Sequence, residues 1–139
     1  MTNIIPDITT ITAVLPVNDV EASAVFFEKI GFHRTNEVSE DPTDPTTPLG
    51  FVIMENGKSQ IMFQSIVSIR NDDENMLPNG DTTAMMFLEV SDLDSVIKAL
   101  DGHAVFMERR ETFYGSKEIG IEGPGEHKFT FAQFNRDTA

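Results

Sequence analysis

The sequence contains no cysteine and no tryptophan, and it has a single tyrosine. Without cysteine the chain cannot form disulfides, thiolate nucleophiles or cysteine-based zinc and iron–sulfur sites. Basic residues are scarce, because 10 Lys and Arg stand against 23 Asp and Glu and give a formal net charge of −13. Charge of this sign repels phosphate groups, so we expect neither a nucleic-acid partner nor binding to an anionic membrane.

Long apolar runs and targeting signals are also missing. No apolar run approaches the ~20 residues that a membrane-spanning helix requires. The first seven residues lack the basic-then-apolar pattern of a signal peptide. We therefore expect a cytoplasmic protein. Its 139 residues correspond to one domain (1–139), and a hydrophobic content of 40% with 11 Phe is sufficient for a core.

The segment from Thr12 to Phe32 predicts a strand, then a helix with an N-cap residue, and a glycine that ends the helix. Apolar and small residues over Thr10–Val17 favour the strand, and Asp19 is a suitable helix N-cap. Gly31 can adopt the left-handed conformation that ends a helix. The predicted buried stripe of the helix is Val20, Ala24, Phe27 and Ile30.

A similar unit recurs in the second half of the chain. Thr83–Val90 predicts a strand, Ser91 or Asp92 a cap, and Gly102 a stop. The predicted stripe of this helix is Leu93, Val96, Ile97 and Leu100. Because 73 residues separate Asp19 from Asp92, the chain contains an internal repeat.

The remaining segments predict strands and their connections. Asn56–Gly57 predicts a hairpin turn, and Glu40–Pro48, with three prolines, predicts an exposed loop. The polar segment Ser68–Asp81 is interpreted as the connection between the halves, and Gly123–His127 as a tight turn. The further predicted strands are Phe32–Val38, Leu49–Glu55, Lys58–Ser65, Val105–Arg110, Lys117–Glu122 and Lys128–Phe134.

These elements predict an α+β fold with two tandem βαβββ modules. Module one covers about 8–66, a linker about 67–81, and module two about 82–136. One small sheet with one helix cannot bury both of its faces, so we expect the modules to pair edge to edge. The result is a curved, mostly antiparallel sheet around a cleft, with the helices on the outer face.

Several motifs then support a resemblance to a known family. They are Leu15–Ser23, Phe26–Phe32, Phe87–Asp94, Tyr114–Glu118 and Gly123–Phe131. With them the chain, from about Ile8 to Phe134, resembles the vicinal oxygen chelate superfamily. That superfamily includes glyoxalase I, bleomycin-resistance proteins, fosfomycin-resistance enzymes and extradiol dioxygenases. Gly123 and Gly125 stand where the family's final turn usually has Asp. In character the chain is most similar to metal-free, bleomycin-resistance-like members.

The resemblance implies four inward positions that in the family's enzymes hold a divalent metal with His, Glu or Gln. Here they are occupied by Thr12, Met62 or Gln64, Met85 and Thr130. A hydroxyl is a poor ligand for such ions, and a thioether suits copper(I). The three histidines, His33, His103 and His127, lie at helix ends and turns, where we expect exposed or capping roles. We therefore expect no metal site and no cofactor.

Strand alternation indicates which side chains face the cleft. The predicted ligand-binding residues are Thr12, Val14, Met62, Gln64, Met85, Phe87, Glu89 and Thr130, with Phe106, Glu108 and Tyr114 at the mouth. The alternative is that these residues only fill a collapsed cleft. The resemblance puts Tyr114 on a loop that closes over a ligand; alternatively its ring packs on the sheet edge.

Glu89 and Glu108 are the catalytic candidates. If both face the pocket, one of them could act as a general base, with its pKa raised by burial and by the other carboxylate. The alternative is that they are rim charges or partners of Arg109, Arg110 or Lys117.

Three hypotheses about function follow. The first is a metal-free small-molecule binding protein, a homodimer that sequesters a cationic or amphipathic compound. The second is a glyoxalase- or dioxygenase-like enzyme whose metal site is rebuilt from Gln64, Glu89, Glu108 or a residue of a partner chain. The third is a cofactor-free isomerase or lyase with Glu89 or Glu108 as its base, in which one Glu→Gln change abolishes turnover.

Overall fold

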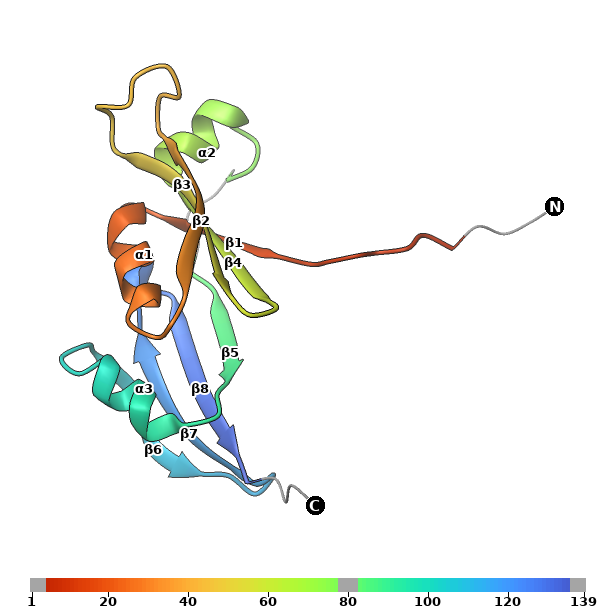
Figure 1. Cartoon of the computed structure of the whole chain (residues 1–139), viewed down its shortest axis with the longest axis vertical. Coiled ribbons are helices and arrows are strands. Elements are labelled where there is room, and N and C mark those ends of the chain that lie inside the picture. Colours follow the sequence, from red (N-terminus) through yellow and green to blue (C-terminus); the bar gives the residue numbers. More distant parts are fainter. Residues whose placement is uncertain (1–4, 78–82, 136–139) are drawn as a thin grey trace.

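A computed structural model describes residues 5–77 and 83–135. Within them the chain forms two βαβββ modules in succession, each with a four-stranded sheet (Figure 1). The predicted α+β class and the internal repeat are confirmed. Hydrogen bonds join the strands within each module, so the described strands form two four-stranded sheets side by side along the molecule.

The first module follows the predicted order of elements. It consists of β1 (Ala13–Val17), α1 (Val20–Glu28), β2 (His33–Ser39), β3 (Leu49–Asn56) and β4 (Ser59–Ser65). Its strands lie in the order β1-β4-β3-β2, with β1 parallel to β4 and the other pairs antiparallel. Residues 5–12 precede β1 and extend away from the modules (Figure 1).

The second module repeats this topology. It consists of β5 (Met85–Glu89), α3 (Leu93–Ala99), β6 (Val105–Glu111), β7 (Ser116–Glu122) and β8 (Lys128–Phe134), with a 3-10 turn, η1 (Pro124–Glu126), before β8. The strand order is β5-β8-β7-β6, and β5 is parallel to β8. Both modules therefore have an edge strand formed by their first strand.

The two module helices begin at the predicted aspartates. The Ala22 amide donates to Asp19 Oδ1 at 3.0 Å, and the Ser95 amide donates to Asp92 Oδ1 at 3.2 Å. Each bond satisfies an amide that has no partner inside its helix. Gly31 ends the α1 region with a φ of 95°. The sequence thus correctly locates both helices.

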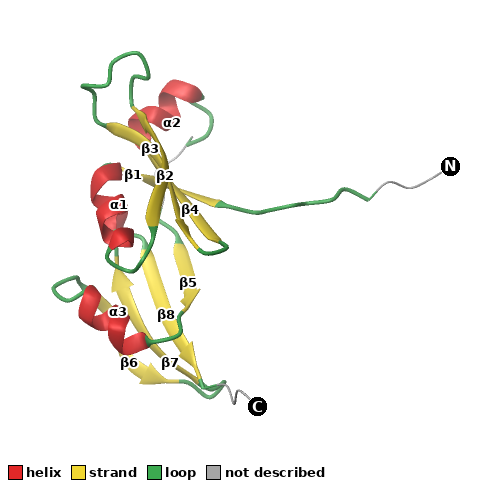
Figure 2. Cartoon of the chain, in the orientation of Figure 1, coloured by secondary structure: helices red, strands yellow, loops and turns green. Residues whose placement is uncertain are grey.

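One hydrophobic core joins the modules. The Phe27 ring of α1 lies 5.2 Å from Phe63 of the first module and 5.3 Å from Phe129 of the second, centroid to centroid. Phe26, which the predicted stripe leaves out, is buried because it packs on Phe129 and on His103 of the second module. Helices α1 and α3 lie on the same side of the two sheets (Figure 2).

The expectation for His127 is wrong, because its side chain is fully buried. The Ala84 amide donates to His127 Nδ1 at 2.8 Å, and His127 Nε2 lies 2.7 Å from the Pro16 carbonyl oxygen. An amide can only donate and a carbonyl can only accept, so the ring is neutral with its proton on Nε2. The turn before β8 lies against β1, which places the imidazole between the modules.

Two local expectations are also corrected. Asn56 pairs with Ser59, so the hairpin loop is Gly57–Lys58, one residue later than predicted. Gly57 alone has a positive φ there, 59°, as a loop with glycine first requires. Within the predicted connection, α2 (Ile66–Asp72) forms because Ser65 caps it by accepting the Ser68 amide at 3.0 Å. Residues 78–82 of that connection lie outside the described residues.

None of the helices in the described part of the chain has the length and apolar character needed to cross a membrane.

Candidate functional site

Each sheet has one face covered by helices and one face that we name the open face. On β1 the side chains of Leu15 and Val17 are buried, whereas that of Val14, the residue before Leu15, is 44% exposed on the open face. On β5 the open face carries Met85, 87% exposed, and Phe87, 54% exposed. Apolar side chains grouped on an uncovered surface mark an interaction or ligand site.

The register places predicted site residues beside one another on each open face. Val14 is the cross-strand partner of Met62, and Phe87 is the partner of Thr130. Cross-strand partners project from the same face of a sheet. The structure thus brings together two separate groups of the predicted residues, one on each module.

Polar residues predicted for the first module already have partners within the chain. Thr12 lies just before β1 and accepts a hydrogen bond from Gln60 Nε2 at 3.0 Å. Gln64 Nε2 donates to Ser68 Oγ at 3.1 Å. These contacts leave Val14 and Met62 as the apolar centre of the first open face.

A row of aromatic rings crosses the second open face. Phe134 lies 6.2 Å from Phe87 on one side and 6.2 Å from Tyr114 on the other, centroid to centroid. Phe113 adds an edge-to-face contact with Tyr114 at 5.1 Å. Sequence reasoning missed Phe134, although the alternation through Thr130 in β8 places it on this face. The row combines large contact area with low flexibility, as ligand sites for apolar groups require.

Beside this row, Phe106 of β6 covers Gly120 of β7. A side chain at Gly120 would collide with the end of the Phe106 ring, so the glycine leaves room for that ring on the sheet. Lys128 Nζ lies 5.6 Å from the centroid of the same ring. Phe106 therefore packs over the sheet at Gly120 and stays 42% exposed.

A buried carboxylate, Glu118, accepts a hydrogen bond from Tyr114 of the aromatic row. Its Oε2 accepts hydrogen bonds from Tyr114 Oη at 2.5 Å and Ser116 Oγ at 2.9 Å, and its Oε1 accepts from Arg110 at 3.0 and 3.2 Å. Burial tends to raise the pKa of this carboxyl, but the three hydrogen-bond donors and the guanidinium charge outweigh it, so the pKa lies below its ordinary value.

Sequence reasoning missed Glu118 and chose two other carboxylates. Strand alternation could have found it. Glu118 lies two residues before Gly120 in β7, so both residues point to the same open face. The chosen residues, Glu89 and Glu108, are both exposed. They lie on β5 and β6, which are the opposite edges of the sheet. Three strand spacings of about 4.8 Å separate the two strands by roughly 14 Å, too far for the two carboxylates to contact one another.

The arginines predicted as partners of these carboxylates have other bonds. Arg110 pairs with the buried Glu118, and Arg109 Nη1 lies 2.5 Å from Asp94 Oδ1 of α3. Arg110 therefore joins β6 to β7 near the loop between them, and Arg109 joins β6 to α3.

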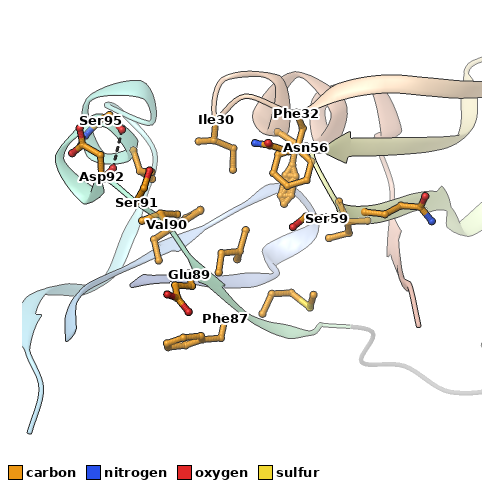
Figure 3. Close-up of a pocket in the computed structure, with 17 residues that line it drawn as sticks. Ile30, Phe32, Asn56, Ser59, Phe87, Glu89, Val90, Ser91, Asp92 and Ser95 are labelled. Atoms are coloured by element: carbon orange, nitrogen blue, oxygen red, sulfur yellow. Dashed lines mark hydrogen bonds between the residues drawn. The ribbon is translucent and has the colours of Figure 1, made fainter. Parts of the chain in front are cut away.

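A cavity of about 590 Å³, which we name the seam pocket, lies between the two modules along the edge strand β5 (Figure 3). Its wall on the first module includes Ile30, Phe32, Asn56 and Ser59. On the second module it includes Val90, Asp92, Ser95 and Val96, and Phe87 and Glu89 of the edge strand also line it. The volume lies in the usual range for small-molecule sites.

The side chains present do not fit the metal site of the family's enzymes. The four positions where ligands are expected carry two threonines and, on β4 and β5, methionines or Gln64. Within residues 5–77 and 83–135, no three His, Asp or Glu side chains are grouped so that they could hold a metal ion. The nitrogens of His127 are both engaged with backbone groups. A hydroxyl and thioether set of this kind is unsuited to zinc, nickel or iron.

The repeated βαβββ module, with helices on one side of two sheets, defines a class of small paired-module proteins. Residues 8–131 match the model of the Glyoxalase/Bleomycin resistance protein/Dioxygenase superfamily. The chain belongs to this superfamily. No curated protein matches the sequence.

Several solved structures share the fold. A glyoxalase/bleomycin resistance protein/dioxygenase from Nocardioides is similar with a TM-score of 0.69 and 19% identity, over 96% of this chain and 89% of that one. A bleomycin resistance determinant encoded on the transposon Tn5 is similar with a TM-score of 0.62 and 16% identity, over 93% and 100%. A bleomycin-binding protein complexed with bleomycin is similar with a TM-score of 0.59 and 15% identity, over 91% and 98%.

Proposed function

We propose that this protein is a metal-free, cytoplasmic, small-molecule binding protein that sequesters a cationic or amphipathic compound. The observation that carries the proposal is the row of rings on the open face of the second sheet, in which half-buried Phe134 lies between the exposed rings of Phe87 and Tyr114. A monomer gains nothing by exposing such a row to water, because burying apolar surface is favourable by about 25 cal/mol per Å². A bound apolar or planar group would cover it.

The charge of the protein supports a cationic group on the ligand. The formal net charge is −13, and Glu89 projects from β5 beside Phe87. A negative surface raises the local concentration of cations and speeds their association. The aromatic faces add cation–π attraction for an ammonium group, worth about 0.5–1 kcal/mol at exposed sites.

The two groups of predicted residues meet if the protein is a homodimer. In one chain the open face with Val14 and Met62 and the open face with Phe87 and Tyr114 belong to different sheets. A second copy that covers both faces would bury the exposed apolar side chains and enclose the ligand between copies. Stable dimers bury about 1,200–2,000 Å² in total. Light scattering is expected to give twice the monomer mass of 15.5 kDa.

The similarity to a bleomycin-binding protein makes bleomycin the first probe. Native mass spectrometry of the purified protein first identifies any co-purified compound. Calorimetric titration with bleomycin then compares the wild type with Phe134→Ala and Tyr114→Ala. Loss of one stacked ring is expected to weaken binding by about two- to tenfold, from 0.5–1.5 kcal/mol per aromatic pair. Val25→Ala, on the exposed surface of α1, is the control.

Equal binding by all four proteins would place the ligand away from the aromatic row. Absence of binding, together with no co-purified compound and a monomeric mass, would contradict the proposal as a whole. A ligand other than bleomycin on the same rings would support the site and exclude only this drug.

A further inference from the structure

We propose that the seam pocket is a second binding site, which takes a neutral aromatic heterocycle that carries a ring N–H donor beside a ring-nitrogen acceptor. This site is separate from the open faces and does not rest on the function proposed for them. The internal repeat makes the two sides of the junction between the modules comparable residue by residue, and they differ in what fills them.

The first difference concerns the helices. Asp19 and Asp92 cap equivalent helices 73 residues apart, so Phe26 of α1 corresponds to Ala99 of α3. Phe26 is buried and packs on Phe129 of the second module. Ala99 is exposed and contributes only a methyl group. One side of the junction is therefore closed by an aromatic ring whose counterpart on the other side is an alanine.

The second difference concerns the sheets. Ile61 of β4 and Phe129 of β8 lie beside equivalent residues of the first strands, so Ser59 corresponds to His127. The imidazole of His127 is fully buried, donates to one backbone carbonyl and accepts one backbone amide. Ser59 is exposed and lines the seam pocket. The pocket therefore lies where the repeat replaces a buried ring, which is both donor and acceptor, with a serine.

The edge of β5 offers the pocket a backbone donor and a backbone acceptor. Among the described strands, β5 pairs with β8 alone. The residues just before and after β5 bond to β8: the Ala84 carbonyl accepts one of its amides, and the Val90 amide donates to one of its carbonyls. Phe87 lies three positions from each of them. Because alternate residues of a strand direct their backbone groups to opposite edges, the Phe87 amide and carbonyl point away from β8. Its ring is on the open face, so Phe87 lines the pocket with this amide and carbonyl.

The walls of the pocket suit an uncharged aromatic ring. Ile30 and Phe32 line it from the first module, and Leu88, Val90 and Val96 line it from the second (Figure 3). Its volume of about 590 Å³ is sufficient for a bicyclic ring system. Burying a charge against such walls is costly, whereas a neutral ring with one donor and one acceptor can bond to the edge of β5.

Three neutral probes of similar size separate the two hydrogen bonds. 7-Azaindole has a ring N–H beside an acceptor nitrogen, indole has only the N–H, and 1-methyl-7-azaindole has only the acceptor. Because the chain contains no Trp, the emission of each probe can be read above that of the single Tyr. 7-Azaindole is expected to bind about fivefold more tightly than either of the others, since each of them lacks one hydrogen bond to β5.

A matched pair of variants tests whether the probe occupies the place of the missing ring. Ser59→His puts into the pocket the residue that fills the equivalent place in the second module, and it is expected to weaken 7-azaindole at least tenfold. Lys58→His puts the same ring on the neighbouring residue, which is exposed and lies outside the lining of the seam pocket. It is expected to leave the affinity unchanged. Circular dichroism confirms that both variants are folded.

NMR identifies the pocket independently of affinity. Ring-current shifts from bound 7-azaindole are expected at the methyl groups of Ile30, Val90 and Val96. No binding of 7-azaindole, equal affinity for the three probes, equal effects of the two histidine variants, or unshifted methyls at these residues would each overturn the proposal. Shifts confined to Val14 and Met62 would place the ring on the open faces, which overturns the second site and leaves the proposed function intact.

Discussion

The imidazole of His127 and the carbonyl of Pro16 are 111 positions apart in the chain and lie 2.7 Å apart in the fold. His127 belongs to the second module and Pro16 to β1 of the first. The ring also accepts the Ala84 amide. Because a buried backbone group without a partner costs free energy, this one side chain satisfies a donor and an acceptor at the junction of the modules.

Removal of this ring should destabilise the junction. His127→Ala leaves the Ala84 amide and the Pro16 carbonyl without partners and creates a cavity, so we expect a loss of about 2–4 kcal/mol in the free energy of unfolding. Urea denaturation followed by circular dichroism measures it. His33→Ala is the matched control, because His33 is exposed and surface changes stay within about 0.5 kcal/mol. Equal effects of the two changes would contradict the role of His127.

Glu118 should make the free energy of unfolding depend on pH in the acid range. Its pKa is lowered in the folded protein, because the hydrogen bonds from Tyr114, Ser116 and Arg110 outweigh burial. A lowered pKa gives stability that is present above the unfolded value of 4.5 and is lost as pH falls through the folded value. We expect the free energy of unfolding to fall below pH 4.5 less steeply in Glu118→Gln than in the wild type. Identical slopes would count against this network.

Tyr114 offers a spectroscopic readout of the same network. It is the single tyrosine of a chain without tryptophan, so tyrosine emission reports on this residue alone. Its hydroxyl donates to the Glu118 carboxylate at 2.5 Å. Carboxylate acceptors quench phenol emission, so Glu118→Gln is expected to brighten it. An unchanged emission in a folded variant would show that the bond is absent in solution.

Two glycines should tolerate a methyl group very differently. A Cβ at Gly123 would overlap the ring of Phe129, which is fully buried and cannot move away. A Cβ at Gly120 would meet the end of Phe106, which is 42% exposed and can rotate into solvent. We expect Gly123→Ala to cost about 1–3 kcal/mol, as overpacking usually does, and Gly120→Ala to cost clearly less. Thermal denaturation of the two variants beside the wild type shows which of them is the less stable.

Divalent metals should not stabilise the protein. The positions where the family's enzymes bind the ion are predicted to carry Thr12, Met62 or Gln64, Met85 and Thr130 here. A ligand at 100 times its dissociation constant adds about 2.7 kcal/mol to stability, which raises the melting temperature by several degrees. We expect no such shift with Zn²⁺, Ni²⁺, Mn²⁺ or Fe²⁺. A stoichiometric metal in elemental analysis of the purified protein, or a shift with one ion, would favour a rebuilt metal site.

The sequence alone determined the module and its repetition. Apolar spacing, the caps Asp19 and Asp92, and the stop at Gly31 are local signals, because they concern hydrogen bonds and burial within one turn or one strand. The same alternation assigned Val14 and Phe87 to faces that the structure leaves open. The short helix α2 was not predicted from the sequence, because its N-cap residue, Ser65, is also the last residue of the strand β4.

Only the tertiary structure decided what happens between elements. The alternation pattern alone did not show that Glu118 is buried beneath Tyr114, that β7 and β8 separate Glu89 from Glu108, or that His127 lies against β1. Each of these depends on strand order and on how the modules meet. Those distances are set by contacts between residues far apart in the chain, which leave no periodic trace in the sequence.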